Sequence, residues 1–488
     1  MSANIIEGLK PEIVWQRFYE LTQVPRPSKK EEKAVEYVRN FAKERNLEFK
    51  EDDVHNIVIK VPATKGYENA PGVVLQGHVD MVCEKNKGTE HDFDNDPIKL
   101  KIDGEWITAE GTTLGADNGI GVAAALATVD DDSFVHGPLE LLLTVDEETG
   151  LTGANNLQPG FVEGRILLNM DSEEDGAFYV GCSGGQDTNG FYNIAKQKTA
   201  AGLVPVEIMV DGLKGGHSGL DVAAGRGNAL QILARYLKKI DGIEYYIAQI
   251  NGGSKRNAIP REAEVIAYVD AANIPAMEKV AEETTTEVLL EYKVNDGGVK
   301  VKVTKVEASY SEVYTKNFTD TIINVLYAMP NGIMAMSPDI EGLVETSTNL
   351  ATINEENGRL RIGTSQRSSI ESAKMYLSDS VAAIFKLSGA DEIMIGDGYP
   401  GWQPNMDSNL LKVSKEVFKG MRGNEAEIKA IHAGLECGIL GDRYPGMDMI
   451  SYGPTIQGAH SPDEMLKIAD IEHFWNLTKG ILEKIAKG

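Results

Sequence analysis

Cysteine is scarce in this 488-residue chain. The three cysteines, Cys83, Cys182 and Cys437, lie far apart and form no CxxC pair. That spacing does not suit a disulfide framework, and it is typical of proteins from a reducing compartment. The cysteine content therefore favours a cytoplasmic protein.

Positive charge and long apolar runs are also in short supply. The chain has 48 Lys and Arg against 74 Asp and Glu, so its net charge is -26. Nucleic-acid binding needs a basic surface, and we therefore expect no nucleic-acid partner. No run approaches the roughly 18 apolar residues of a membrane span. Because the opening MSANIIEGLK also lacks the apolar core of a signal peptide, we expect no membrane association and no secretion.

The chain is long enough for two or three domains, and 42% of its residues are hydrophobic. Apolar residues recur at helical spacing over 13–21 and again after Ser28 and Glu31, which have the spacing of a helix capping box. Apolar runs at 73–75, 139–145 and 166–168 predict buried strands, and the small residues of 119–129 predict a packed helix. Strands that alternate with helices indicate an α/β sheet.

The middle of the chain differs from its two ends. Between residues 188 and 398, strand-like segments alternate with amphipathic helices, and this stretch contains few clusters of residues that could bind a metal. We therefore predict an α/β domain built from residues 1–187 and 399–488, with residues 188–398 inserted as a second domain. Asn257 and Asn349 each precede a hairpin-like pair of strands. This faint repeat raises the hypothesis that the insert is a duplicated α/β unit.

Five segments place an acidic residue or a histidine at the end of a predicted strand or in the loop after it. Ligands of open α/β sheets bind outside the carboxyl ends of the strands, so these side chains can converge. Buried charge at a strand end is costly unless it is paired or binds a metal. Each residue alone is more often structural or solvated, but their recurrence in strand–helix order favours a shared site. The residues are His78, Asp80, Asp117, Glu147, Glu148, Asp171 and His460.

Two histidines with several carboxylates and no cysteine suit a catalytic zinc or a similar ion. Two ions about 3.5–4 Å apart can share one carboxylate and a water, and the glycine-flanked Asp117 is suited to bridge them. Glu147 and Glu148 are neighbours, so one can bind metal while the other acts as a general base. We expect two divalent ions, Zn²⁺ first, with Co²⁺ and Mn²⁺ as alternatives that accept the same ligands.

The motifs and their order resemble the M20 metallopeptidases. Within that family the motifs are similar to those of the aminoacyl-histidine (Xaa-His) dipeptidase branch. In this sequence they are GHVDMVCEKN, GTTLGADNGIGVA, DEETGLTGA, NMDSEEDG, GCSGG and IHAGLECG. The resemblance covers essentially the whole chain. It implies an α/β, zinc-peptidase-like catalytic domain with a mixed central sheet, interrupted by an inserted α+β lid domain.

The resemblance also implies a role for each residue. Glu147 matches the general base, and Asp80 matches the carboxylate that orients His78, as a ligating imidazole requires. The peptide after the bridging carboxylate is commonly cis in this family, which makes Asp117–Asn118 a candidate for that geometry. The implied ligands are His78 and Asp171 for one ion, Glu148 and His460 for the other, and Asp117 for both.

Four further residues are implied to contact substrate. His217, in GGHSG of the insert, resembles the lid histidine that polarises the scissile carbonyl and stabilises the oxyanion. Arg367 resembles the lid arginine that grips a substrate carboxylate, a task that suits a guanidinium fork. Asn257 matches a family Asn-x-Ile-Pro segment. A dipeptidase must also bind the substrate ammonium group, for which Glu436 is a candidate anion, as are Asp117 and Asp171 at the metal centre. The length of the insert implies that the chain supplies His217 to its own site, whether it is a monomer or a homodimer.

The function implied is hydrolysis of unblocked dipeptides, with a small peptide as the partner. Xaa-His substrates such as β-alanyl-histidine are expected together with broader dipeptide activity, through a hydroxide that bridges the metals and Glu147 as general base. An N-acyl amino-acid deacylase or an aminopeptidase with the same two ions is the alternative among enzymes. A metal-binding or scaffolding protein with an inactive site is the alternative outside enzymes, and the intact Glu147 argues against it.

Overall fold

The computed structural model describes residues 5–488, so the first four residues of the segment considered as a signal peptide lie outside it. The chain divides into two compact units. The terminal unit, built from both ends of the chain, extends to Gly181 and also contains Trp402–Ala430 and Leu435–Gly488. The inserted unit contains Cys182–Gly401 and Ile431–Gly434. These limits differ by a few residues from those expected, and Ile431–Gly434 joins the inserted unit although it lies in the C-terminal part of the sequence.

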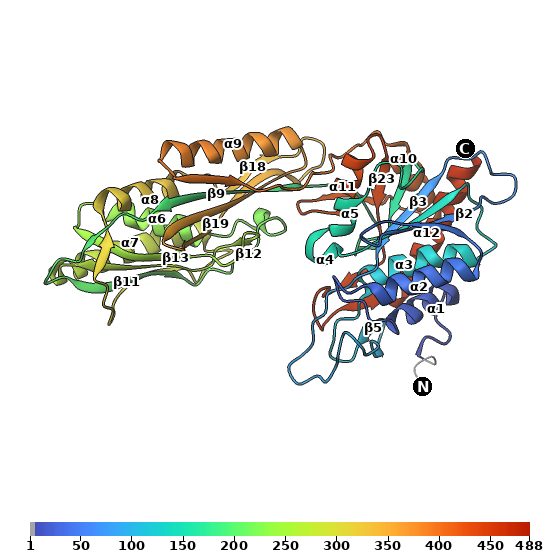
Figure 1. Ribbon diagram of the computed structural model, residues 1–488, viewed down its shortest axis with the longest axis horizontal. Coiled ribbons are helices and arrows are strands. Elements are labelled where there is room, and N and C mark those ends of the chain that lie inside the picture. The colour runs from blue at the N-terminus through green and yellow to red at the C-terminus, as the bar shows by residue number, and fades with distance from the viewer. Residues whose placement is uncertain (1–4) are drawn as a thin grey trace. The chain divides into compact units, whose positions relative to one another are not determined.

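An eight-stranded mixed sheet forms the centre of the terminal unit (Figure 1). From one edge to the other its strands are β1 (Glu48–Glu51), β2 (Ile57–Val61), β6 (Leu139–Thr144), β3 (Val73–His78), β7 (Ile166–Asn169), β23 (Asp448–Ser451), β8 (Ala177–Cys182) and β22 (Glu427–Ile431). β3 runs parallel to β6 and to β7. β3 and β6 are buried along their whole length, as expected of parallel strands covered on both faces.

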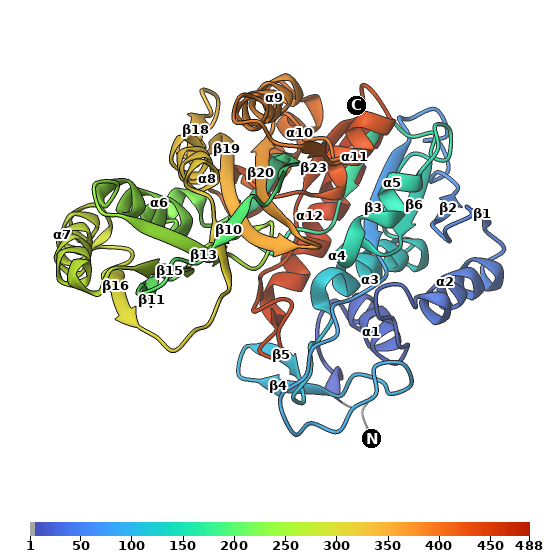
Figure 2. The ribbon, with the colours of Figure 1, turned by 60° about the vertical axis from the view of Figure 1, so that its left-hand side comes forward.

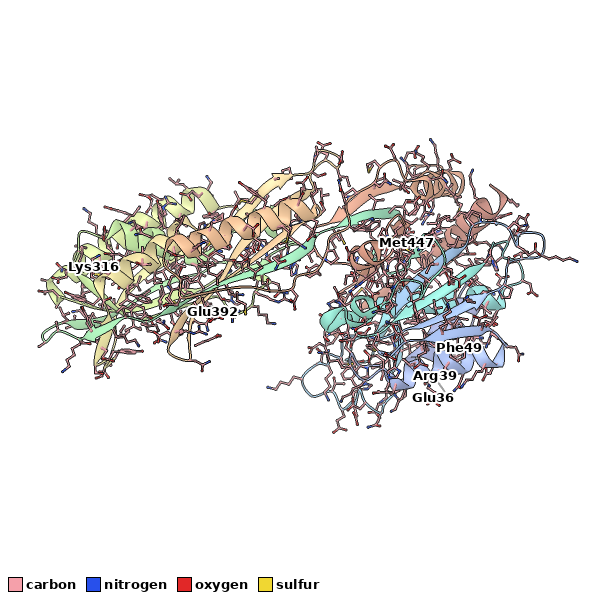
Figure 3. The ribbon with its side chains drawn as sticks, turned by 45° about the horizontal axis from the view of Figure 1, so that its top comes forward. Glu36, Arg39, Phe49, Lys316, Glu392 and Met447 are labelled. Atoms are coloured by element: carbon pink, nitrogen blue, oxygen red, sulfur yellow. The ribbon has the colours of Figure 1, made fainter. Side chains whose placement is uncertain are left out.

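Helices cover this sheet (Figure 2). They are α1 (Glu12–Thr22), α2 (Glu32–Glu44), α3 (Ala116–Asp130), the short α4 (Glu147–Gly150) and α5 (Thr152–Asn156), α10 (Asn409–Arg422), α11 (Glu436–Arg443) and α12 (Ile468–Lys487). α3 packs against α1 and β3, and its Gly and Ala residues allow that close approach. α2 packs against β1 and β2. Figure 3 labels Glu36 and Arg39 of α2 and Phe49 of β1, and Arg39 Nε donates to Glu51 of that strand at 2.9 Å.

The start of α2 corrects one expectation. Ser28 and Glu31 have the spacing of a capping box, yet no side chain caps this helix. Ser28 Oγ instead donates to Asp80 Oδ2 at 2.8 Å, and Glu31 Oε1 accepts from the backbone N–H of Asp146 at 3.0 Å. The capping-box prediction is wrong because both side chains bond to loops at the strand ends, where buried polar groups need partners.

A small sheet in the same unit holds the loop that carries His460. Its strands are β24 (Ile456–Gln457), β25 (Met465–Lys467), β5 (Trp106–Ala109) and β4 (Leu100–Asp103). β25 pairs with β24 on one side and β5 on the other. The loop between β24 and β25 is therefore anchored at both ends, and it belongs to the same unit as β3, β6 and β7.

The inserted unit is built on a nine-stranded sheet. One half has the strand order β16 (Lys300–Lys305), β11 (Val204–Asp211), β15 (Ala263–Val269), β13 (Tyr245–Gly252), and the other half has β19 (Val344–Glu356), β20 (Arg359–Ser368), β9 (Gly184–Asn193), β21 (Glu392–Ile395), with β18 (Gly332–Met336) beside β19. The helices are α6 (Ala229–Lys239), α7 (Ile274–Tyr292), α8 (Lys316–Ala328) and α9 (Glu371–Leu387). Without β18 and the strands of the two-stranded sheets, each half has the order β–α–β–β–α–β, and the whole first half lies in the sequence between β9 and α8 of the second. A duplicated unit would produce this order, and the duplication stays a hypothesis.

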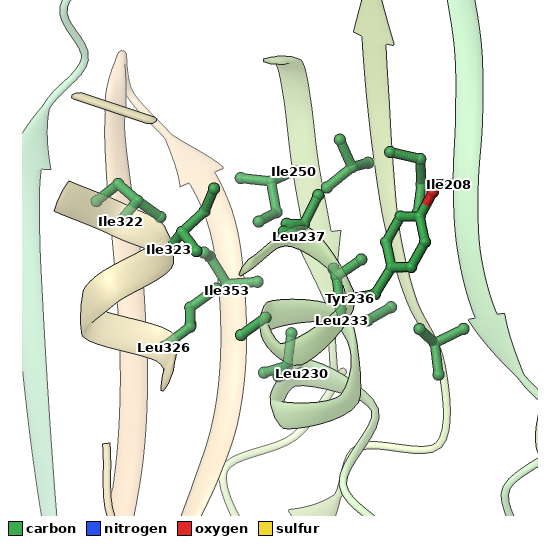
Figure 4. Packing of buried hydrophobic residues seen from close by; sticks show 14 of the residues in the cluster. Ile208, Leu230, Leu233, Tyr236, Leu237, Ile250, Ile322, Ile323, Leu326 and Ile353 are labelled. Atoms are coloured by element: carbon green, nitrogen blue, oxygen red, sulfur yellow. The ribbon is translucent and has the colours of Figure 1, made fainter. Parts of the chain in front are cut away.

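The core of the inserted unit lies between its helices and its sheet (Figure 4). Asn228 caps α6 by accepting from the N–H groups of Leu230 and Gln231. The buried residues of the cluster labelled in the figure are Ile208, Leu230, Leu233, Tyr236, Leu237, Ile250, Ile322, Ile323, Leu326 and Ile353. Across residues 5–488, no helix combines the length and the apolar character that a membrane crossing requires.

Candidate functional site

Neighbouring strands of the large sheet deliver acidic and imidazole groups to one edge. His78 is the last residue of β3, Glu147 and Glu148 open α4 soon after β6, and Asp171 follows β7 by two residues. These three strands are parallel, so their carboxyl ends meet at the same edge, as expected. Asp117 reaches this edge from the first turn of α3.

One group of three possible ligands consists of His78, Asp117 and Asp171. His78 Nε2 lies 3.3 Å from Asp117 Oδ1 and 3.3 Å from Asp171 Oδ1. His78 is 1% exposed. Burial, opposed by the charge of His78 and reinforced by nearby Asp117 and Glu436, raises the pKa of Asp171 to about 8. Without a cation the neutral form of Asp171 is therefore favoured near neutral pH, and a cation bound beside it would stabilise its charged form.

A second group shares Asp117 with the first. His460 Nε2 lies 3.1 Å from Asp117 Oδ2 and 3.0 Å from Glu148 Oε2. Burial alone would raise the pKa of Asp117, but the hydrogen bonds from His460 and His78 lower it below its ordinary value. His460 has a φ of 62°, a left-handed backbone that side chains other than glycine rarely adopt. The Asp117–Asn118 peptide is cis, in agreement with the expectation from the sequence.

These two groups fit a pair of divalent cations. In each group, ligand-type atoms from three residues lie within 4.8 Å of one another. Glu148 Oε1 and Asp171 Oδ1 are buried oxygens that accept no hydrogen bond, which suits atoms that coordinate metal. Imidazole with carboxylate and no thiolate is a donor set of catalytic rather than structural zinc sites. Asp117 has one carboxylate oxygen in each group, so it is placed to bridge two ions.

Asp80 links the histidine ligand to the Glu147–Glu148 turn. Its Oδ1 lies 3.2 Å from His78 Nδ1, on the far side of the ring from the ligand groups. It also accepts from the backbone N–H of Glu147 at 3.1 Å and of Glu148 at 3.3 Å. One wholly buried carboxylate thus orients the imidazole and fixes the turn that carries two acidic side chains, as expected of a group that supports metal ligands.

Glu147 differs from Glu148 in its partners. It can join His78 and Glu148 in a compact group of ligand-type atoms, but among the described residues its carboxylate makes no hydrogen bond or ion pair. Burial, followed by the charges of Asp171, Glu436 and Glu148 and opposed by His78, raises its pKa. A carboxylate without a fixed partner, whose proton affinity is raised, is suited to accept and release a proton.

Glu436 lies close to the ligands. Its carboxylate is 0% exposed and accepts from Gln76 Nε2 at 2.5 Å and Thr144 Oγ1 at 2.8 Å. Burial, opposed by the neighbouring His78, raises its pKa to about 7. Both of these hydrogen bonds go to Oε2, and Oε1 is buried without a partner. Contact of Glu436 with a substrate ammonium stays a prediction. The place of Glu436 is that of a support for the strand ends.

Glu464, which sequence reasoning missed, holds the loop in front of α3. Its carboxylate is buried and accepts from the N–H groups of Leu114 at 2.7 Å, Gly115 at 2.9 Å, Ala116 at 2.7 Å and Asp117 at 3.3 Å. Because Glu464 follows His460 by four residues, it ties the loop of one ligand to the backbone of the bridging ligand. The signal was present in the sequence as the acidic residue of SPDE after His460.

Arg26, also missed, holds the same loops through their carbonyl groups. It is 1% exposed and donates to the carbonyls of Val79 at 3.1 Å and Asp80 at 2.9 Å, and to that of Gly115. A Cβ at Gly115 or Gly119 would lie 2.5 or 2.6 Å from the Arg26 Nη2 atom. These two glycines of the GADNG motif therefore leave room for the guanidinium. Nothing in the sequence around Arg26 indicates this contact.

In the inserted unit, His217 ends β12 (Gly216–His217), which pairs with β14 (Ala258–Ile259), and Asn257 directly precedes β14 and accepts from the backbone N–H of Ser218 at 2.9 Å. His217 Nδ1 accepts from the backbone N–H groups of Gly219 at 3.2 Å and Leu220 at 3.0 Å. Burial and Arg367 lower the pKa of His217, with Asp221 opposing. The ring is thus neutral with its proton on Nε2, which makes Nε2 a hydrogen-bond donor.

Comparisons with known proteins place the sequence and the fold among peptidases. The sequence model of peptidase family M20/M25/M40 matches residues 74–484. The "Cytosol non-specific dipeptidase" of Escherichia coli (strain K12) is 41% identical over 482 residues, which cover 98% of this chain and 99% of that protein. The crystal structure of the aminoacylhistidine dipeptidase from Vibrio alginolyticus is 41% identical, with a TM-score of 0.91 and 99% of both chains covered. A tripeptidase from Staphylococcus aureus, 16% identical with a TM-score of 0.57 over 98% of this chain and all of that one, shares the fold.

The shared position of Asp117 predicts how metal content responds to substitution. Asp117→Ala removes one ligand from each group and is expected to leave the purified chain with neither ion after dialysis. His460→Ala removes a ligand from one group only and is expected to retain about one ion. Elemental analysis of metal per chain measures both, with circular dichroism to verify folding. Equal losses from the two variants would contradict the bridging position.

The hydrogen bonds of Glu464 predict that this residue supports metal binding although it is not a proposed ligand. Glu464→Gln keeps one acceptor oxygen and turns an amide N–H toward the backbone donors of residues 114–117. We expect the apparent affinity for the ions to fall about 10- to 100-fold, the usual effect of removing a group that supports metal ligands. Competition with a coloured chelator measures that affinity.

Asp448→Asn provides the matched control for this substitution. The carboxylate of Asp448 accepts from Ser408 Oγ and, at 3.0 Å, from the backbone N–H of Leu410 near the start of α10, and neither residue is a proposed metal ligand. The control is expected to keep the affinity of the parent chain. An equal decrease in both variants would assign the effect to general loss of stability.

Proposed function

The chain belongs to peptidase family M20/M25/M40, and on this premise we propose that it is a metal-dependent dipeptidase. Its relatives at 41% identity over nearly their whole length are named as dipeptidases. The observation that carries the proposal is the pair of ligand groups joined by Asp117, with Glu147 beside them and free of any fixed partner. That arrangement supports hydrolysis and not metal storage, because a general base adds nothing to a storage site.

We assign one ion to His78 and Asp171, the other to Glu148 and His460, with Asp117 shared. When bound, the two ions would activate a water molecule and polarise the scissile carbonyl. Zn²⁺ agrees best with a donor set of imidazole and carboxylate, and Co²⁺ and Mn²⁺ are the alternatives that the same ligands accept.

Two residues of the chain carry out the remaining tasks: Glu147 transfers the proton and His217 stabilises the developing charge. Glu147 takes a proton from the attacking water as the water oxygen bonds to the carbonyl carbon, and it gives that proton to the leaving nitrogen as the C–N bond breaks. His217 donates from Nε2 to the carbonyl oxygen, where negative charge develops. The products are two amino acids, so atoms and protons balance without a further reactant.

Substrate choice is assigned to the inserted unit and to the free termini of the dipeptide. Arg367 binds the substrate carboxylate through its guanidinium, and Asn257 contributes from the segment beside His217. We propose unblocked dipeptides as substrates, Xaa-His among them, because one relative is described as an aminoacylhistidine dipeptidase and another as non-specific. The name of the Escherichia coli relative also supports a cytoplasmic location.

A panel of four substrates tests the proposed activity. We expect metal-loaded protein to hydrolyse Gly-Gly and β-alanyl-histidine, and to leave N-acetyl-glycine and N-acetyl-histidine intact. Amino-acid analysis of the products measures both outcomes. Release of acetate with no cleavage of either dipeptide would replace the dipeptidase assignment with that of a deacylase.

Glu147 has a specific expected effect. Glu147→Gln removes the proton acceptor and leaves the proposed ligands unchanged, so kcat is expected to fall about 10²- to 10⁴-fold with both ions retained. Steady-state kinetics on Gly-Gly together with metal analysis separate the two effects. Full activity of this variant, with two ions bound, would remove Glu147 from the mechanism.

A further inference from the structure

Arg367 is a buried cation without an anion. It is 6% exposed, and its Nε atom is buried without a hydrogen-bond partner. Its Nη1 donates to Tyr399 Oη at 2.9 Å, and within residues 5–488 it forms no ion pair with a carboxylate. A buried charge is costly unless a counter-charge reaches it. The guanidinium is therefore placed for an anion that comes from outside the chain.

The two histidines near Arg367 do not add to its charge. His432 Nε2 lies 2.7 Å from Ser347 Oγ, and burial, followed by the charge of Arg367, lowers the pKa of His432 to about 3. Burial and Arg367 also lower the pKa of His217. Of Arg367, His217 and His432, only Arg367 is therefore positively charged, which suits an anion with one negative charge.

The strand register places Tyr399 and Arg367 on the same face. Arg367 of β20 is opposite Gly185 of β9, and Gly185 forms a bridge with Tyr399 on its other side. Residues opposite one another across strands point to the same face of a sheet. A Cβ at Gly185 would lie 2.6 Å from the Tyr399 ring and 2.7 Å from its Oη. The missing side chain at Gly185 therefore lets the phenol reach Arg367.

The position of Tyr399 is fixed from several directions. Its carbonyl accepts from the buried Lys374 Nζ at 2.6 Å and from the N–H of Gly185 at 3.1 Å. Its own N–H donates to the carbonyl of Gly185 at 2.9 Å. A Cβ at Gly434 would lie 2.8 Å from the ring. The glycines of GCSGG and HAGLECG thus close around one phenol, which points to a need for that ring at this place.

The phenol of Tyr399 has one hydrogen left to donate. Its oxygen accepts from Arg367, and a phenol can accept and donate at the same time. In the part of the chain that the structure describes, no acceptor for this hydrogen is found. We propose that Tyr399 and Arg367 together bind the C-terminal carboxylate of the dipeptide, the guanidinium by charge and the phenol by its O–H. This inference rests on the proposed dipeptidase activity and adds a specificity-determining residue to it.

Tyr399→Phe tests the proposal, because it removes the phenol oxygen and keeps the ring between the two glycines. The measurement is kcat/KM for Gly-Gly and for glycylglycinamide, which has no carboxylate. We expect the preference for Gly-Gly over the amide to fall about tenfold, mainly through KM for Gly-Gly, since a hydrogen bond to a charged group is lost. In an Arg367→Met background the same change should alter the preference by less than about twofold, because both residues act on one carboxylate.

Tyr192→Phe is the matched control. Tyr192 lies on the same strand as Gly185, and its Oη bonds Ser388 Oγ at 2.7 Å, away from Arg367. It should keep the substrate preference of the parent chain. An unchanged preference in Tyr399→Phe, or an equal loss on both substrates, would overturn the proposal while the dipeptidase activity of the parent stands. If the metal-loaded parent cleaves neither substrate, the proposed function itself fails.

Discussion

Buried negative charge is the constraint on which the metal site depends. Asp80 and Glu436 are 0% exposed and Glu464 is 2% exposed, and all three lie beside further carboxylates. Isolated charges of this kind cannot remain in a protein interior. Glu464 is stabilised by four backbone N–H groups, and Glu436 by an amide and a hydroxyl. Arg26 supplies one positive charge nearby, and the remaining negative charge faces the space that two divalent ions are suited to occupy.

The structure brings together the residues that the sequence predicts as metal ligands, because each of them follows an apolar strand or lies in a loop with a distinctive motif. Parallel strand ends meet at one edge whatever the details of packing, so His78 and Asp171 could be brought together from pattern alone. The contacts of Arg26 and Glu464 could not be predicted, although Glu464 is recognisable as an acidic residue near His460, because their partners are backbone atoms of distant loops. Such contacts can also override a local sequence pattern. Ser28, for example, bonds to Asp80 instead of capping α2.

In the inserted unit, too, contacts between distant segments could not be predicted from the sequence. The sequence links Asn257 and Asn349 only as a faint repeat, and the structure brings their segments into contact. Asn349 Nδ2 donates to the carbonyl of Ala258 at 2.8 Å, and Ala258 is the residue opposite His217 in the short β12–β14 pair. The second half of the unit therefore supports the hairpin that holds His217. This contact depends on how the two halves pack, which no periodicity within either half reveals.

The order of the ligands along the chain bears on how the enzyme is made. Asp117 and His460 are 343 residues apart, and Leu114 and its acceptor Glu464 are 350 apart. Chains emerge from the ribosome N-terminus first, so β3, β6 and β7 are synthesised long before the loop that completes the second ion's ligands and anchors α3. On the proposed assignment of ligands, only the ion held by His78 and Asp171 has its ligands before the C-terminal loop is made. The second ion is then expected to bind after His460 has been synthesised.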